Sequence, residues 1–583
     1  MCGIFLLLNS DEAGKEIVQR EFIKGKNRGP ENSTLLESNY KLTIGFHRLA
    51  INGLNAMSNQ PIEFNGVILI CNGEIYNYKS LYSILKVDPT TESDCEVIIH
   101  LYLKYGIKQT LEMLDGVFAF ALYDKRNINT TNNLSLYVAR DALGIRPLYR
   151  LKNNNLGYIY DNLIGFASEL KCLDKFVSYN CYQYGIDQFK PGTYSSFEIS
   201  IECRSIWKTK IENEPFFIPT FSYGILQEHA AATVPDDIVK SVSHHLSSAV
   251  TRQCGATQRP IACLLSGGLD SSLIAALVND YCIQNEVPYP LETYSIGLVG
   301  SEDLKYAQIM ADYLGTKHTA IYVTEQEMFD AIPDVIYAIE SYDTTTVRAS
   351  IGNYLIGKYI SKHSEAKVIF NGDGSDELCG GYLYMNKCPD DIEFDKEIRR
   401  LLKDIYMFDV LRSDKCISSH GLEPRTPFLD RSFVNHYLSI APCYRNHTNF
   451  NQCEKFLLRS SFSFPNYENS NGLQLLPNEI LWRRKEAFSD GVTSKGRSLF
   501  NIIQEKVARK ITNDTGIPCT ESIEVEKLYY KRVFNDYYPN TGNILPYYWM
   551  PKYTNATDPS ARTLDLYADN KDRKDIQFAF SSC

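Results

Sequence analysis

The chain has 583 residues, of which 44% are hydrophobic and 22% charged, and its formal net charge at pH 7 is −10. This length exceeds what one hydrophobic core supports, so we expect more than one domain. The acidic balance argues against broad binding of nucleic acids or anionic membranes, and no apolar run approaches the roughly 18 residues of a membrane span. The sixteen cysteines contain no CxxC pair, which argues against a zinc or redox motif and indicates a reducing compartment, the cytoplasm.

The chain begins with the sequence MCGI, which places a thiol at position 2. If Met1 is removed, as is usual before a small residue, Cys2 carries a free α-amine with a pKa of roughly 7.7–8.0. A nucleophile and a proton acceptor then share one residue, which is a known arrangement for nucleophilic catalysis. These four residues alone leave open whether position 2 is catalytic or arbitrary.

Residues 1 to about 205 alternate short apolar runs with Asn, Gly and Asp, which predicts a strand-rich region. One segment, residues 94–101, has helical periodicity instead. The proline-containing stretch 208–220 is the predicted linker to the second half. The predicted strands are residues 4–8, 41–51, 67–71, 116–123, 136–140 and 165–168.

After the predicted linker, strands alternate with longer helices. This alternation predicts right-handed βαβ units and a parallel sheet. Beyond residue 390 the chain is predicted to be helical and irregular. The predicted helices are residues 236–252, 271–282 and 302–314, and the predicted strands are residues 261–265, 293–298, 319–323 and 367–370.

One predicted strand of this half, IACLL, runs directly into SGGLDSS and then into a helix. Ser266, Gly267 and Gly268 allow a tight turn whose backbone amides face an anion at the start of the helix. The hydroxyls of Ser271 and Ser272 add donors for phosphate. No GxxxxGK[ST] occurs in the chain, so this is not the usual P-loop. The alternative to a phosphate site is an ordinary glycine-rich turn.

A second acidic loop follows another predicted strand, in the sequence KVIFNGDGSDELCGGY. It contains Asp373, Asp376 and Glu377. In doubly wound sheets, ligands bind beyond the carboxyl ends of the strands. We therefore expect Asp270 of the first loop and Asp376 of the second to hold Mg²⁺ jointly against a polyphosphate. The alternative for the second loop alone is a solvated acidic turn.

Many short sequences along the chain occur together, and in the same order, in one enzyme family. In the first half they are MCGI, NRGPE, GFHRLAI, CNGEIYN, SDCEVI, LDGVFAFALYD and ARDALGIRPLY. In the second half they are LLSGGLDSS, YDTTTVRAS, NGDGSDELCGGY, DVLRSDKCISSHGLEPRTPFLD, LWRRKEAFSDGV, YYWMPKY and DPSARTL. Over roughly residues 1–565 the chain therefore resembles the glutamine-hydrolysing asparagine synthetases, which are ligases of asparagine biosynthesis.

The resemblance implies a multidomain α/β protein. Its parts would be an N-terminal-nucleophile glutaminase domain with αββα layers (2–205), a linker (206–230), a doubly wound parallel synthetase domain of the ATP-pyrophosphatase type (231–540), and a C-terminal extension and tail (541–583). The activity would be conversion of aspartate to asparagine through β-aspartyl-AMP, with glutamate, AMP and pyrophosphate as further products. The partners would be the small molecules glutamine, aspartate and ATP, with Mg²⁺, and the protein would be a cytoplasmic homodimer.

For the glutaminase site, the resemblance implies that Cys2 attacks the side-chain carbonyl of glutamine, assisted by its own α-amine. The Asn72 side-chain amide and the Gly73 backbone N–H would stabilise the oxyanion. Arg48 would bind the α-carboxylate of glutamine with both branches of its guanidinium. The other glutamine-binding residues would be Leu49, Ala50, Ile51 and Asn52 along that edge, and Glu74 and Asp94 at the ammonium group.

For the synthetase site, the resemblance implies that the SGGLDSS loop binds the pyrophosphate of ATP. Lys485 would neutralise charge at the pyrophosphate and the activated carboxylate. Without the resemblance, Lys485 could equally be a helix lysine whose aliphatic stem lies along the protein surface. The nucleotide-binding residues would be Leu265, Ser266, Gly267, Gly268, Asp270, Ser271, Ser272, Ile296, Asn371 and Gly372. The aspartate-binding residues would be Thr345, Thr346 and Arg348, with the arginine at a carboxylate.

One departure from the family concerns a catalytic position. Where the family usually has Ser-Gly-Glu-Gly, this chain has Asn371-Gly372-Asp373-Gly374. Asp373 keeps the negative charge but is one methylene shorter than the glutamate associated with formation of the aspartyl-adenylate. Either a water molecule bridges the gap, or the activity is reduced.

Two alternatives to an asparagine-forming enzyme remain at this point. One is a related ligase that acts on another carboxylate, such as a β-lactam-forming enzyme, against which the retained Cys2 weighs. The other is a non-catalytic relative, against which the joint presence of Cys2, Asp270 and Lys485 weighs.

Overall fold

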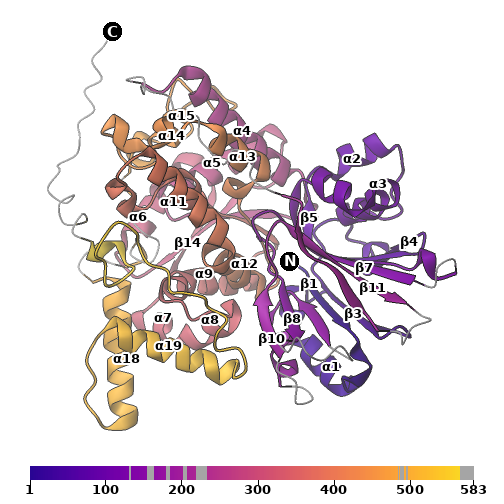
Figure 1. Cartoon of the computed structure of the whole chain (residues 1–583). Coiled ribbons are helices and arrows are strands. Elements are labelled where there is room, and N and C mark those ends of the chain that lie inside the picture. The colour runs from indigo at the N-terminus through magenta and orange to yellow at the C-terminus, as the bar shows by residue number, and fades with distance from the viewer. Residues whose placement is uncertain are drawn as a thin grey trace.

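The computed structural model consists of two halves that lie side by side (Figure 1). Among the described residues, the N-terminal half contains two six-stranded antiparallel sheets, and the C-terminal half contains a five-stranded parallel sheet. In the part of the chain that is described, no helix is long and apolar enough to cross a bilayer. The described residues are 1–129, 133–153, 163–178, 184–200, 206–217, 233–483, 485, 491–493, 497–564 and 567.

In the first antiparallel sheet, the order of hydrogen-bonded neighbours differs from the order of the strands in the sequence, whereas in the second sheet the two orders agree. The first consists of β10 (Tyr184–Gln188), β8 (Tyr149–Asn153), β9 (Ile164–Ala167), β1 (Gly3–Leu8), β3 (Leu42–Arg48) and β2 (Asn32–Ser38). The second consists of β12 (Lys208–Pro215), β11 (Thr193–Ser200), β7 (Asn133–Arg140), β6 (Gly116–Asp124), β5 (Val67–Ile75) and β4 (Ile62–Phe64).

Alternation along the strands explains why the two sheets stack. Ile4, Leu6 and Leu8 of β1 point into a core shared by both sheets. Phe5 and Leu7 point outward and pack with α1 (Lys15–Ile23). The second sheet is covered on its outer face by α2 (Tyr78–Leu85) and α3 (Val97–Met113). This arrangement of layers confirms the predicted αββα domain.

The parallel sheet has the order β15 (Lys317–Tyr322), β14 (Glu292–Gly297), β13 (Ile261–Leu264), β16 (Val368–Phe370) and β17 (Glu423–Arg425). The chain builds outward from β13 to β15 and then returns to β16 on the other side. The strand order therefore reverses between β13 and β16, which is the point where doubly wound sheets bind ligands.

Helices cover both faces of the parallel sheet, which confirms the doubly wound prediction. One face packs on α4 (Asp236–Cys254), α5 (Leu269–Gln284) and α6 (Glu302–Leu314). The other packs on α9 (Thr344–His363) and α12 (Asp409–Ser418). The other α-helices in the described part of this half are α7 (Glu325–Asp330), α8 (Ile332–Ile339), α10 (Ser375–Cys379), α11 (Asp391–Asp404), α13 (Arg431–Ser439), α14 (Pro442–Arg445), α15 (Phe456–Ser461), α16 (Asn478–Leu481), α18 (Leu499–Thr515) and α19 (Ile523–Tyr537).

The predicted linker requires a correction at its beginning. Residues 208–215 form β12, which pairs with β11 at the edge of the second sheet. Pro215 is tolerated there because it is the last residue of an edge strand. The later part of the predicted linker, residues 218–230, lies outside the described residues.

Candidate active sites

Cys2 directly precedes β1, and its side chain is partly buried. The thiol donates to the carbonyl oxygen of Leu49 with an Sγ–O distance of 3.5 Å. Burial raises the pKa of the Cys2 thiol above its ordinary value. The thiol is therefore protonated at neutral pH and needs a neighbouring base to react.

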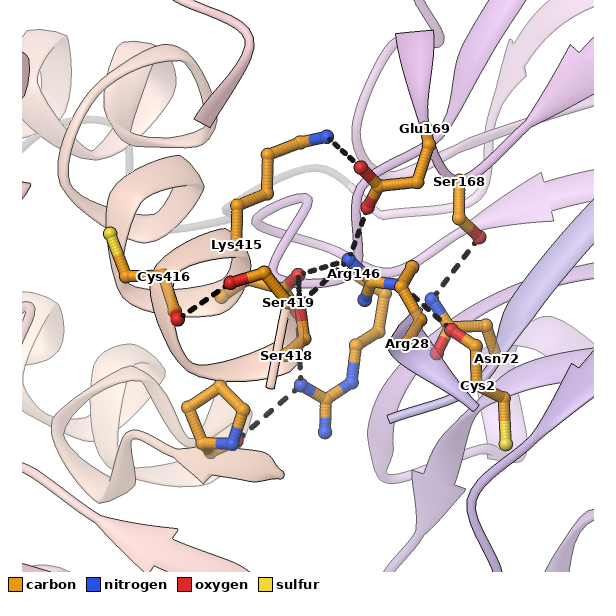
Figure 2. A network of polar contacts seen from close by, with 12 residues as sticks. Cys2, Arg28, Asn72, Arg146, Ser168, Glu169, Lys415, Cys416, Ser418 and Ser419 are labelled. Carbon is orange, nitrogen blue, oxygen red and sulfur yellow. Dashed lines mark hydrogen bonds and ion pairs between the residues drawn. The ribbon is translucent and has the colours of Figure 1, made fainter. Parts of the chain in front are cut away.

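The predicted oxyanion residues lie on β5, close to the start of β1. Ser168 joins the two strands, because its Oγ accepts from the Ile4 amide at 3.1 Å and lies 3.4 Å from Asn72 Nδ2 (Figure 2). A side chain at Gly73 is excluded, since a Cβ there would lie 2.1 Å from the carbonyl oxygen of Val117. The structure thus brings Asn72 and Gly73 to the end of the sandwich from which Cys2 projects.

Arg48 organises the predicted glutamine-binding edge. Its terminal nitrogens donate to the carbonyl oxygens of Asn52, Gly53 and Asn55 and to Asn59 Oδ1, the last at 2.7 Å. These bonds fold residues 52–59 around the guanidinium. The predicted fork onto a substrate carboxylate would require some of these bonds to be exchanged.

The two carboxyl groups predicted to hold the ammonium group of glutamine are both buried. Asn52 donates to Glu74 at 2.7 Å, and the Ile75 amide donates to Asp94 at 2.7 Å. Burial raises the pKa of Asp94 to about 6. Burial and the nearby charge of Asp94 also raise the pKa of Glu74. A bound ammonium group would favour the ionised form of both carboxyl groups.

Arg28 connects the Cys2 backbone to the other half of the chain (Figure 2). Its Nε donates to the Cys2 carbonyl oxygen at 2.8 Å. Its Nη1 lies 2.8 Å from both Glu169 and Asp414, and 2.9 Å from Ser418 Oγ. Asp414 and Ser418 belong to α12, so this buried guanidinium ties the backbone at Cys2 to the C-terminal half.

A cavity of about 220 Å³ opens beyond the carboxyl ends of β13, β14 and β16. The structure therefore brings the two predicted loops to one site. The predicted residues that line it are Leu265, Ser266, Gly268, Asp270, Ser271, Ile296, Thr345, Asn371, Gly372, Asp373, Asp376 and Lys485. Those that do not line it are Gly267, Ser272, Thr346 and Arg348.

The SGGLDSS loop is held by its own hydroxyls. The Ser266 amide donates to Ser271 Oγ at 3.1 Å, and the two serine hydroxyls lie 2.9 Å apart. Gly267 has φ +71°, and a Cβ there would lie 2.4 Å from the backbone of Tyr306 and Ala307. The loop therefore packs tightly against α6 and presents the start of α5 to the cavity.

Two lysines lie between the two predicted metal-binding carboxylates. Lys455 Nζ lies 2.6 Å from Asp270 and 2.5 Å from Asp376, and Lys485 Nζ lies 2.6 Å from Asp376. Burial opposes ionisation of Asp376, but the two lysines hold its pKa well below the usual range. The sequence predicted Lys485 and missed Lys455, which precedes α15 in a segment without a recognisable phosphate motif.

The donor set at this cluster fits Mg²⁺ shared with a phosphate. Asp270 and Asp376 supply hard oxygen ligands, and one or two protein carboxylates are usual for Mg²⁺ that is also bound by phosphate. Among the described residues, no group of three or more His, Cys, Asp or Glu could hold a metal ion. The protein residues alone would therefore leave the coordination incomplete.

Asp373 faces the cavity with one oxygen unpaired. Its Oδ1 lies 3.2 Å from Arg412 Nη2, while its Oδ2 is buried and has no hydrogen-bond partner among the described residues. Arg412 also binds Asp409, which belongs to the same helix, α12. The shortened carboxylate is therefore positioned by Arg412 and keeps a free oxygen.

The three residues predicted to bind aspartate do not lie at one site. Thr345 lines the cavity, and within the described part of the chain its Oγ1 has no hydrogen-bond partner. Thr346 instead binds Asp343, which caps the start of α9. The prediction for Arg348 needs correction, because its guanidinium is buried and forms two ion pairs with Glu526 and Asp558. With both carboxylates in place, Arg348 has no side free for a substrate.

The chain matches known proteins over both halves. A model of the glutamine amidotransferase domain matches residues 1–209, and a model of asparagine synthase matches residues 241–390 and 387–543. The asparagine synthetase (glutamine-hydrolysing) of Gallus gallus is 39% identical over 587 residues, covering 97% of this chain and 99% of the relative. The chain belongs to this family.

Other relatives agree with this membership. The asparagine synthetases (glutamine-hydrolysing) of Cricetulus griseus and Homo sapiens are each 38% identical, with 97% of this chain and 99% of each relative covered. A solved structure of glutamine-dependent NAD+ synthetase from Acinetobacter baumannii with adenosine diphosphate covers 71% of this chain and 61% of its own, at 15% identity. Its TM-score is 0.23. Membership confirms the predicted fold class and the predicted class of ATP-using ligase.

Replacement of Gly267 by alanine tests the packing of the SGGLDSS loop. The added Cβ collides with the α6 backbone, so we expect aspartate-dependent ATP–pyrophosphate exchange to fall by roughly tenfold or more. The control is Gly315→Ala, whose φ is +67° and whose Cβ meets nothing within 4 Å. Equal losses in both variants would mean that backbone strain, and not the collision, is responsible.

Replacement of Asp376 by asparagine tests the carboxylate–lysine cluster. The change leaves Lys455 and Lys485 with one carboxylate between them, so exchange should fall by roughly a hundredfold or more. Glutamine hydrolysis, measured as glutamate release, should change less than about twofold, because its residues lie in the other half. The control is Asp390→Asn, at an exposed helix cap. Exchange that survives in folded Asp376→Asn would remove the cluster from the reaction.

Proposed function

We propose that the chain makes asparagine from aspartate, ATP and glutamine in two half-reactions, one in each half of the molecule. The observation that carries this proposal is the joint presence of a thiol site and an ATP-type cavity in a member of this family. A further proposal is that the glutaminase domain extends through β12, which ends at Pro215. The linker would then run to residue 230, the synthetase domain from 231 to 540, and the C-terminal extension and tail from 541 to 583. A homodimeric state and a cytoplasmic location stay predictions.

In the glutaminase half-reaction, the Cys2 sulfur attacks the side-chain carbonyl carbon of glutamine. The α-amine exposed by removal of Met1 takes the thiol proton and delivers it to the departing ammonia. Asn72 and the Gly73 amide stabilise the oxyanion of the tetrahedral intermediate. Water then hydrolyses the thioester, which releases glutamate and frees Cys2.

In the synthetase half-reaction, a side-chain oxygen of aspartate attacks the α-phosphorus of ATP. The bond to the β-phosphate breaks, and pyrophosphate leaves toward the SGGLDSS loop, whose backbone amides and hydroxyls donate to it. The positive charges of Lys455 and Lys485 stabilise the departing pyrophosphate. Ammonia then attacks the activated carbonyl carbon and displaces AMP. Mg²⁺ bound by Asp270 and Asp376 would neutralise phosphate charge during this reaction.

The Cys2→Ala variant separates the two half-reactions. Synthesis of asparagine from glutamine should fall at least a thousandfold, because the nucleophile is gone. Synthesis from added ammonium should stay within about twofold of the unmodified protein, since Cys2 has no part in activation of aspartate. The measurement is asparagine formed with glutamine alone and with ammonium alone. Near-normal synthesis from glutamine would overturn the role of Cys2.

Lengthening Asp373 tests whether the short carboxylate limits activation. A glutamate extends the unpaired oxygen further into the cavity, so Asp373→Glu should raise aspartate-dependent ATP–pyrophosphate exchange by roughly two- to tenfold. Unchanged or lower exchange would mean that aspartate already acts at its present length, through a bridging water. Unchanged exchange in Asp373→Ala would show that the carboxylate has no role.

A further inference from the structure

The end of the chain returns to the synthetase cavity. After α19, the chain runs back across the C-terminal half, as the yellow trace in Figure 1 shows. We call residues 549–564 together with Tyr567 the C-terminal strap. Two of its residues, Ala561 and Tyr567, line the cavity that contains the SGGLDSS loop. Apart from one short turn, Ala561–Thr563, and the helical residue Tyr567, the described part of the strap forms no helix or strand. Contacts with other elements must therefore hold it in place.

A buried three-residue ion cluster provides one such contact. Arg348 of α9 contacts Glu526 of α19 through Nε at 2.8 Å and Nη2 at 2.6 Å. The same guanidinium contacts Asp558 of the strap through Nη1 at 2.7 Å and Nη2 at 2.9 Å. The side chains of Arg348, Glu526 and Asp558 are 3%, 0% and 8% exposed. Paired, desolvated charges of this geometry hold position far better than exposed ones.

The first turn of α9 holds the strap at a second point. Asp343 caps this helix through Oδ2, and its Oδ1 accepts from the Trp549 amide at 2.8 Å. The Trp549 ring lies 5.3 Å from the ring of Tyr382, which lines the cavity. Thr345, between the two anchors, also lines the cavity. The first turn of α9 thus contributes Thr345 to the cavity wall, and it also anchors the C-terminal strap, which contributes another part of the wall.

We propose that the Arg348–Asp558 pair is a positioning device for the synthetase reaction, holding the strap so that Ala561 and Tyr567 close one side of the cavity. This rests on the proposed function, because the cavity must be where ATP and aspartate react. An activated aspartyl-adenylate is open to attack by water, and a closed wall excludes water until ammonia arrives. A loosened strap therefore increases the amount of AMP formed for each asparagine made.

The test is Asp558→Asn, assayed with ammonium as nitrogen donor. The neutral side chain keeps its size but loses the charge that pairs with Arg348. We expect the ratio of AMP to asparagine to rise at least about twofold, and KM for ATP to rise roughly threefold or more. Glutamate release from glutamine should not change. The matched control is Glu524→Gln on α19, whose side chain is 72% exposed and pairs with Lys527; neither value should move.

Two results would overturn the proposal. One is an unchanged AMP-to-asparagine ratio and unchanged KM in a folded Asp558→Asn protein. The other is a lower melting temperature with equal losses of synthesis and glutamine hydrolysis at an unchanged ratio, which marks a purely structural anchor. If Asp558→Asn does not fold, Tyr567→Ala removes a wall residue without touching the ion cluster, and an unchanged ratio there overturns the proposal. Failure of the proposed function is separate, because the unmodified protein would then make no asparagine from ammonium.

Discussion

Buried charge at the boundary between the two halves constrains the whole molecule. Arg28, Glu169, Asp414 and Lys415 are each at most 5% exposed. An ion removed from water costs several kcal/mol unless a partner compensates it. The partners come from both halves, since Arg28 binds Asp414 and Lys415 binds Glu169. The halves can satisfy these charges only in one relative arrangement, and that arrangement fixes the backbone at Cys2.

The helix α12 connects these buried charges to the synthetase cavity, because its side chains contact both. Asp414 and Ser418 face the Arg28 cluster, while Arg412 and Asp409 face the cavity. Because the four side chains belong to one ten-residue helix, the position that satisfies Arg28 also sets the distance from Arg412 to Asp373. The two sites are therefore built on shared structure, although they belong to different domains.

The sequence predicted what is local and missed what depends on distant partners. Cys2 and the SGGLDSS loop could be proposed as site residues from the sequence because a terminal thiol and a glycine-rich turn after a strand carry their chemistry in a few adjacent residues. Lys455 was missed because nothing around it marks a phosphate site, and only the fold brings it to Asp270, 185 residues away. Arg348 was misassigned for the same reason, since Glu526 and Asp558 are 178 and 210 residues away.

The charged side chains that line the synthetase cavity carry a net negative formal charge. Among the described lining residues, five cationic side chains face seven carboxyl groups. The cations are already paired, Arg459 with Glu454 and Arg483 with Asp303 as well as the two lysines with their aspartates. A triphosphate entering this cavity would meet net negative charge, which the lysines could relieve only by leaving Asp270 and Asp376. A divalent cation at these carboxylates would release Lys455 and Lys485 to the phosphates, so the proposed Mg²⁺ and nucleotide would favour each other's binding.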